Sequence, residues 1–153
     1  MADHLLHFVR RPLGGQEFAD IGALTVLHAC GAVSAFYGVA RPDEVDGRRV
    51  TALEYEAFES MAEREIRLLV VAARSHWPVA WAFVRHSLGR VRAGEISVAI
   101  AVGTPHRAEA YAASRFLIEG IKHEVPVWKK ERFEDGSARW AACTHAGGRL
   151  AHV

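Results

Sequence analysis

A proline at position 126 is the feature that most constrains the fold of this chain. The apolar pattern of residues 105–124 predicts a long helix. That helix cannot continue through Pro126, because the proline ring clashes with the carbonyl four residues back and has no N–H to donate. The chain must turn here, between Lys122 and Lys129. We therefore expect Lys122 at a helix end and Lys129 at a strand start, close enough to face one pocket.

The segments around this break predict the fold class. Residues 128–133 and 138–142 flank an Asp-Gly turn and are typical of a β-hairpin. The earlier segments predict two helices, one at 17–29 and one that runs from a capping box at 60–63 to a stop at 77–78. They also predict a loop at 41–49 and a turn at 89–94. Strands are expected at 32–37, 50–57, 79–88 and 95–103. We expect one α+β domain, with a mixed or antiparallel sheet flanked by helices and a C-terminal β-hairpin.

Composition limits the classes of function. The chain has 153 residues, half of them hydrophobic, which is enough for the core of one domain. Its net charge of +1 gives no global field for nucleic acid or a membrane. Cys30 and Cys143 are too few for a disulfide scaffold, and the N-terminus lacks the pattern of a signal peptide, so we expect a cytoplasmic protein. The histidines show no metal-ligand spacing, and we expect neither a metal nor a cofactor.

One run needs to be weighed as a membrane span. Residues 21–40 contain no Asp, Glu, Lys or Arg and are about as long as a spanning helix requires. Gly22, Gly31 and Gly38, together with polar residues, dilute the apolar character of the run. We therefore expect a helix followed by a strand here, and no membrane contact.

A second cluster lies at the start of the last helix. Thr104 is a good N-cap and Pro105 a good first helical residue. His106 and Arg107 then oppose the helix dipole, which favours acidic residues in the first turn. A bound anion would explain them, since the free N–H groups and the dipole already attract one. The alternative is a structural arginine paired with a carboxylate and a histidine packed in the core.

The two clusters are far apart along one helix. Lys122 follows His106 by 16 residues, which at ~1.5 Å per residue separates them by roughly 24 Å. One small ligand cannot touch both in one subunit. Either they serve different sites, or a second copy of the chain in a two-fold dimer supplies the other half.

Several blocks of the chain form a distinctive set. They are residues 31–41, 53–58, 86–89, 94–96, His106-Arg107 and 122–131, the last with its Pro-Val-Trp-Lys-Lys-Glu run. In consistent order and spacing, they resemble the large, catalytic subunit of molybdopterin synthase. The resemblance spans about residues 31–140 and leaves a divergent tail at 141–153 within a single domain covering 1–153.

The resemblance implies an α/β-hammerhead-like fold and a sulfurtransferase of molybdenum cofactor biosynthesis. Such subunits form a homodimer with a small ubiquitin-like sulfur-carrier subunit at each end, a heterotetramer. The carrier's C-terminal Gly-Gly thiocarboxylate enters the large subunit's pocket. Cyclic pyranopterin monophosphate (precursor Z) gains two sulfurs there and becomes the dithiolene molybdopterin.

The resemblance also implies roles for individual residues. Lys122 and Lys129 correspond to the catalytic pair. Residues expected to bind substrate are Phe36, Val39, Ala40, Arg41, His106, Arg107, Lys130 and Glu131. The chain departs from the family pattern after Arg41, where Pro42-Asp43-Glu44 follows, and at Thr144, where some relatives have a further arginine; the register of Arg149 is too uncertain for that role.

Other readings of the same residues stay open. Lys122 could only complement a helix dipole, and Lys129 and Lys130 could guard a solvated strand edge. Trp128 and Trp140 are expected in the core. For the whole chain, the alternative is a non-catalytic dimeric module that binds phosphorylated ligands or nucleic acid through the basic cluster.

Overall fold

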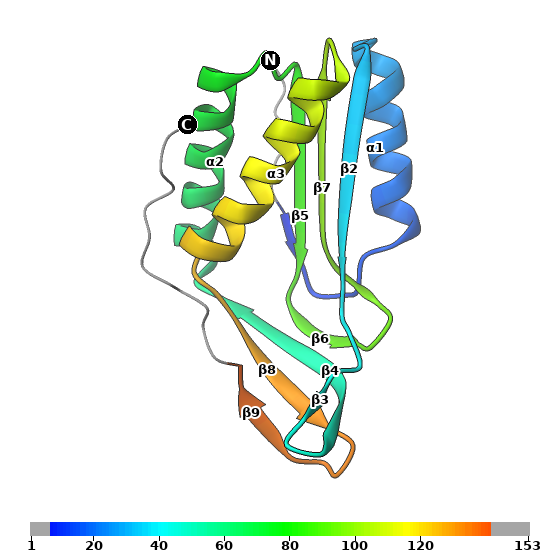
Figure 1. The fold of residues 1–153 in the computed structure, drawn as a ribbon, viewed down its shortest axis with the longest axis vertical. Helices are drawn as coiled ribbons and strands as arrows, with labels where there is room; N and C mark the ends of the chain where they lie inside the picture. Colours follow the sequence, from blue (N-terminus) through cyan, green and yellow to red (C-terminus); the bar gives the residue numbers. More distant parts are fainter. Residues whose placement is uncertain (1–6, 142–153) are drawn as a thin grey trace.

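The computed structural model describes residues 7–141 of the chain. Three helices and two sheets make up this part (Figure 1). In chain order the elements are β1 (His7–Val9), α1 (Gly15–His28), β2 (Ala32–Val39), β3 (Glu44–Val45), β4 (Arg48–Ala57), α2 (Glu59–His76), β5 (Trp81–Ser87), β6 (Gly89–Arg92), β7 (Ile96–Thr104), α3 (Arg107–Glu124), β8 (Val127–Phe133) and β9 (Ala138–Trp140).

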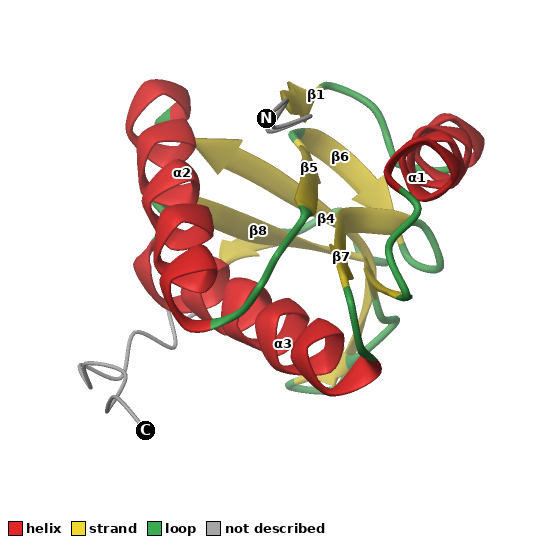
Figure 2. Ribbon diagram, turned by 90° about the horizontal axis from the view of Figure 1, so that it is seen from above, coloured by secondary structure: helices red, strands yellow, loops and turns green. Residues whose placement is uncertain are grey.

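A mixed sheet with the strand order β1-β5-β7-β2 forms the centre of the larger part of the molecule. Helices cover both of its faces (Figure 2). Successive side chains of a strand point to opposite faces, and both central strands are almost continuously buried. On β5, Ala82 and Val84 pack in the core cluster with α2 and α3, whereas Trp81 and Phe83 pack in the cluster with α1. The almost continuous burial of β5 and β7 therefore reflects a sheet covered on both sides.

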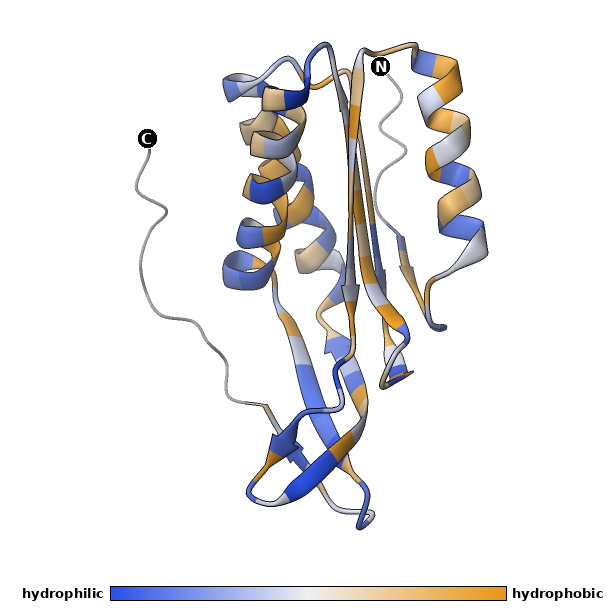
Figure 3. Ribbon diagram, turned by 45° about the vertical axis from the view of Figure 1, so that its right-hand side comes forward, coloured by the Kyte–Doolittle hydropathy of each residue, from blue (hydrophilic) through white to orange (hydrophobic). Residues whose placement is uncertain are grey.

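The second sheet extends below the first in Figure 1 and has the order β3-β4-β8-β9, with β6 also paired to β4. This sheet carries more hydrophilic residues than the central one (Figure 3). Its small core consists of Ala40, Val50, Leu53, Val91 and Phe133. The expected C-terminal hairpin is confirmed: Gly136 has φ +82° in the β8–β9 turn. The α+β class is confirmed as well.

Two segments expected to be irregular form strands instead. Residues 41–49 contain β3 and the start of β4, joined by Asp46 (φ 52°) and Gly47 (φ 73°). Asp-Gly is the preferred sequence for such a hairpin turn. Residues 89–94, expected to be a turn, contain β6, which pairs with β4. Both strands are very polar, so no apolar alternation marked them, and they exist because β4 provides backbone partners.

The capping box expected at residues 60–63 is not formed. The second helix begins at Glu59, so Ser60 lies inside it, and the N-cap, Phe58, has no side-chain capping bond. The Phe58 N–H instead donates to the carbonyl of Pro126 at 3.2 Å. A tertiary hydrogen bond thus joins the start of α2 to the proline break.

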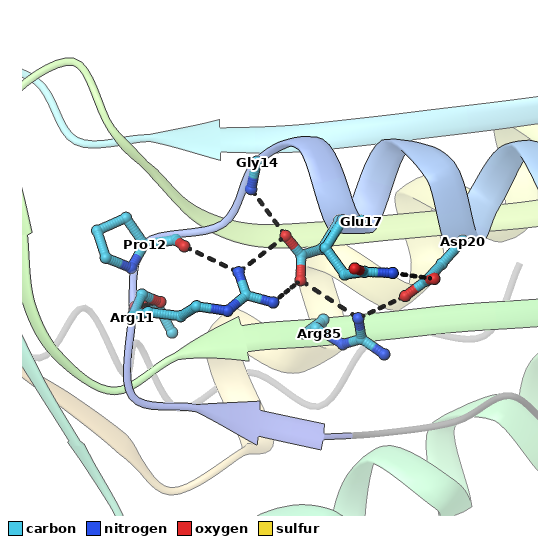
Figure 4. A network of polar contacts seen from close by, with 8 residues as sticks. Arg11, Pro12, Gly14, Glu17, Asp20 and Arg85 are labelled. Atoms are coloured by element: carbon cyan, nitrogen blue, oxygen red, sulfur yellow. Dashed lines mark hydrogen bonds and ion pairs between the residues drawn. The ribbon is translucent and has the colours of Figure 1, made fainter.

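A buried carboxylate anchors α1 to the sheet (Figure 4). Glu17 is fully buried and accepts hydrogen bonds from Arg11 (2.7 and 3.1 Å), the Gly14 N–H (2.7 Å) and Arg85 on β5 (3.2 Å). Burial by itself would raise the Glu17 pKa, but these donors outweigh it and lower the pKa to about 2. Arg85 also donates to Asp20 at 2.8 Å. The network fixes α1 through charge as well as through apolar contact.

The uncharged run at residues 21–40 contains the end of α1 and the whole of β2, as expected. No helix within residues 7–141 is both long and apolar enough to cross a membrane.

Candidate active site

A cleft of about 410 Å³ lies where the two sheets meet the C-terminal end of α3. Strands from both sheets form its walls, and the last turns of α3 and the start of β8 close one side. Its lining residues are Phe36, Gly38, Val39, Arg41, Asp43, Val50, Leu53, Tyr55, His86, Ser97, Val98, Ile118, Ile121, Lys122, Val127, Trp128, Lys129, Glu131 and Ala141.

Lys122 and Lys129 both line this cleft, as the proline break predicted. Helix α3 ends at Glu124 and β8 begins at Val127, so Pro126 separates two elements that diverge. Buried Val125 and the bond from Phe58 to the Pro126 carbonyl hold the turn in place. Lys122 lies in the last turn of the helix and Lys129 on the strand, and both are exposed.

Four further predicted residues lie in the same cleft. Phe36 and Val39 come from the end of β2, where a bulge between Gly38 and Val39 shifts the register against β7. Arg41 follows, and its guanidinium lies 3.2 Å from the carboxylate of Asp43. Glu131 lies two residues after Lys129 on β8, and its side chain is 16% exposed. The unusual Pro42-Asp43-Glu44 sequence thus supplies a carboxylate partner for Arg41.

Two predicted residues lie outside the cleft lining although their neighbours belong to it. Ala40 is buried, and its backbone bonds to the Glu95 carbonyl and the Gly94 N–H. Lys130 alternates with Lys129 and Glu131 along β8, and its ammonium lies 4.6 Å from the centre of the Trp140 ring. Strand alternation therefore divides the Lys-Lys pair between two faces.

His106 and Arg107 are exposed at the opposite end of α3 from Lys122, and neither lines the cleft. Within one chain the two clusters are therefore separate, as helix length predicted. The expected capping by Thr104 is wrong. Thr104 ends β7, pairs with Ala32 and donates to the His106 carbonyl at 2.7 Å, so the helix begins only at Arg107. Strand pairing outweighs the capping preference here.

Three neutral polar residues in the cleft were not predicted as site residues: Tyr55, His86 and Ser97. Burial lowers the pKa of His86 to about 4, against the smaller opposite effect of its bond to the Ser87 carbonyl. The Tyr55 ring packs edge-on against the imidazole at 4.9 Å, and burial raises the Tyr55 pKa. Ser97 donates to the Gly38 carbonyl at 3.2 Å. Only the alternating pattern of residues 50–57 hinted that Tyr55 faces inwards.

The two tryptophans expected in the core are largely exposed. Trp128 is 42% exposed and lines the cleft, and Trp140 is 53% exposed beneath Lys130. Within residues 7–141, no helix packs over the part of the second sheet formed by β8 and β9 (Figure 1). Thr144, which stands where some relatives have a further arginine, lies outside the described residues, as do Arg149 and the rest of the tail from 142 onwards.

Comparison with known proteins gives a consistent result. The sequence profile of the family described as MoaE protein matches residues 15–124. The molybdopterin synthase catalytic subunit of a Nostoc species is 43% identical over 132 residues, covering 84% of this chain and 79% of that protein. The crystal structure of molybdopterin synthase from Staphylococcus aureus superposes with a TM-score of 0.77 at 34% identity, covering 88% of this chain and 95% of that one.

A more distant structure shares the fold. It is the protein-protein complex of subunits 1 and 2 of molybdopterin-converting factor from Helicobacter pylori, with a TM-score of 0.75, 22% identity and 90% of each chain covered. The family match covers most of the chain, and the identity to the Nostoc protein extends over most of both sequences. The chain therefore belongs to the MoaE protein family, together with the molybdopterin synthase catalytic subunits that it matches.

Proposed function

We propose that this chain catalyses the transfer of sulfur from the thiocarboxylated C-terminus of a small carrier protein to cyclic pyranopterin monophosphate. The single observation that supports this most is the convergence of Lys122, Lys129 and Arg41 on one cleft from three different segments. Its relatives are catalytic subunits of molybdopterin synthase, which supports the same reaction.

The cleft suits an anionic nucleophile. A thiocarboxylate carries negative charge, and preorganised cations stabilise such charge most strongly where apolar walls exclude water. Ile118, Ile121 and Val98 provide apolar walls beside the two lysines. We assign Lys122 to the attacking thiocarboxylate and to proton movement at the pterin side chain. Lys129 then holds the substrate or the end of the carrier, and Glu131 and Arg41 complete the binding site.

A second copy of the chain would supply the phosphate site. His106 and Arg107 are exposed, and their backbone lies at the N-terminus of α3, where free N–H groups favour an anion. Because they cannot reach Lys122 of their own chain, we assign them to the active site of the other subunit in a two-fold dimer. The substrate's phosphate would bind there, since the planar guanidinium pairs bidentately with phosphate oxygens.

The sulfur donor is a separate subunit in this proposal. The Helicobacter complex of subunits 1 and 2 contains a chain of the same fold and supports such an assembly. The exposed side chains of Val39 and Trp128 lie at the cleft and suit contact with an extended carrier tail. We also propose a cytoplasmic location, in keeping with the free thiol of Cys30.

The decisive experiment mixes the chain with a thiocarboxylated carrier and precursor Z, and measures molybdopterin. Product must depend on both reactants and must disappear with Lys122→Ala while the variant stays folded. A folded dimer that makes no molybdopterin would contradict the proposal. If the chain instead binds nucleic acid, with an affinity that falls steeply with salt and is unchanged by Lys122→Arg, it is a nucleic-acid-binding module.

A further inference from the structure

The cleft contains two carboxylates as well as its three cations, and each carboxylate is paired with an arginine. Asp43 pairs with Arg41 at 3.2 Å, and Glu131 accepts a hydrogen bond from Arg139 Nε at 2.8 Å. In the part of the chain from 7 to 141, no ion pair joins Lys122 or Lys129 to a carboxylate. The two lysines therefore remain available although an acid lies nearby.

Glu131 is the acid with the easiest path to Lys129. The two residues lie on the same face of β8, two positions apart, which places their Cα atoms roughly 6.6 Å from each other. Both side chains are long enough to meet across that distance. Without another partner, the Glu131 carboxylate would be expected to pair with the Lys129 ammonium.

Arg139 prevents this by holding Glu131 from the neighbouring strand. The two residues are direct partners in the β8–β9 ladder. A second nitrogen of the guanidinium, Nη1, lies 3.2 Å from Asp46 in the β3–β4 turn, and the group stands 5.8 Å from the centre of the Phe133 ring. Arg139 is thus fixed at three points, and the interaction with Glu131 raises the Arg139 pKa.

We propose that Arg139 is a positioning residue for sulfur transfer, which keeps the Glu131 carboxylate away from Lys129 so that the ammonium can bind an anionic reactant. The proposal rests on the function proposed above, because Lys129 is the residue through which Arg139 acts. Arg139 itself does not line the cleft.

A purely structural role makes a different prediction. The Arg139 side chain is 42% exposed, and exposed ion pairs contribute little to stability. If Arg139 only stabilised the β8–β9 hairpin, its removal would slightly destabilise the protein. A further substitution of Glu131 would then not reverse any change in the reactivity of Lys129. If Arg139 acts on charge, removing the Glu131 charge must cancel the effect of removing Arg139.

The chain offers a clean chemical readout, because its only lysines are Lys122, Lys129 and Lys130. An acylating reagent reacts with neutral amines, and a nearby carboxylate favours the charged, unreactive ammonium. We expect Arg139→Ala to slow the acylation of Lys129 by roughly two- to five-fold, as for an exposed ion pair. The double variant Arg139→Ala/Glu131→Gln should restore the wild-type rate. Rates at each lysine are measured by peptide mass spectrometry.

Arg132→Ala is the matched control. Arg132 on the same strand pairs with Glu54 at 2.6 Å, and neither residue lines the cleft. This variant should lose a similar ion pair and leave Lys129 labelling unchanged. Arg139→Gln, with a side chain of intermediate length, replaces the alanine variant if that one melts more than about 3 °C below the wild type.

Unchanged Lys129 labelling in a folded Arg139 variant, or slowed labelling that Glu131→Gln does not restore, would overturn the proposal. In the reconstituted reaction, Arg139→Ala should lower the rate of molybdopterin formation and Arg139→Lys should lower it less. A wild-type rate for Arg139→Ala would also overturn it. If the wild-type chain itself makes no molybdopterin, the proposed function fails, whereas the labelling result still reports whether Arg139 controls Glu131.

Discussion

Lys122 and Lys129 line one cleft from two elements that diverge at Pro126, the last turn of α3 and the strand β8. The third lysine, Lys130, is held over the Trp140 ring on the other face of the same strand. Two adjacent residues with the same chemistry therefore have different surroundings, and substitution can separate their roles.

Alanine at either cleft lysine should abolish most of the sulfur transfer. We expect Lys122→Ala and Lys129→Ala to lower the rate by roughly 100-fold or more, the usual loss of a preorganised charge partner. Lys130→Ala should cost less than about tenfold, since strand alternation turns its ammonium away from the reactants. Molybdopterin formation measures all three. A larger loss at Lys130 than at Lys129 would contradict the assignment of faces.

The composite dimer site predicts complementation between inactive variants. Lys122→Ala and Arg107→Ala should each be inactive alone, because both alter every site of their own homodimer. After the two are unfolded and refolded together, mixed dimers contain one intact site, and about a quarter of wild-type activity should return. The control is the same mixture of the two folded variants without unfolding, in which no subunits are exchanged. If mixed dimers form but no activity returns, the lysines and the His106-Arg107 pair do not share one active site across the dimer.

The Glu17 network predicts a loss of stability in acid. Its pKa falls from an ordinary 4.5 to about 2 in the folded protein, so the carboxylate stabilises the fold above pH 5 and loses this effect as the pH falls towards 2. At about 1.4 kcal/mol per pH unit the difference amounts to about 3 kcal/mol. Urea unfolding at several pH values measures it. Glu17→Gln should be less stable at pH 7 and show a flatter pH dependence.

Two glycines provide a matched test of close packing. A Cβ at Gly31 would lie 2.0 Å from the Pro105 carbonyl oxygen, whereas at Gly22 it would meet nothing within 4 Å. Gly31→Ala should destabilise the fold by about 1–3 kcal/mol, because backbone has to move. Gly22→Ala, in the exposed face of α1, should stabilise it by about 0.5–1 kcal/mol. Equal melting temperatures for the two variants would contradict the packing at Gly31.

The candidate site was predictable where local chemistry decides the backbone. Pro126 cannot be helical, so the chain had to turn between the two lysines, and the 18-residue helix α3 necessarily separates His106 from Lys122. The Asp135-Gly136 hairpin followed from the same kind of rule.

Other local preferences were overruled by pairing with distant segments. Thr104 stayed in a strand opposite Ala32, and Phe58 bonded to Pro126 in place of a capping box.

The sequence by itself therefore determined the order of the three helices and the longer strands, the break at Pro126 and the lysines on either side of it. Only the tertiary structure decided which groups surround them: the neutral His86 and Tyr55, the Asp43 partner of Arg41, and Arg139 holding Glu131. A proline restricts the backbone at its own position, and an Asp-Gly pair favours a hairpin turn without help from distant residues. Burial and pKa depend on groups that are remote in sequence, such as Tyr55 beside His86. The pairing of Glu131 with Arg139 depends on how β8 and β9 align.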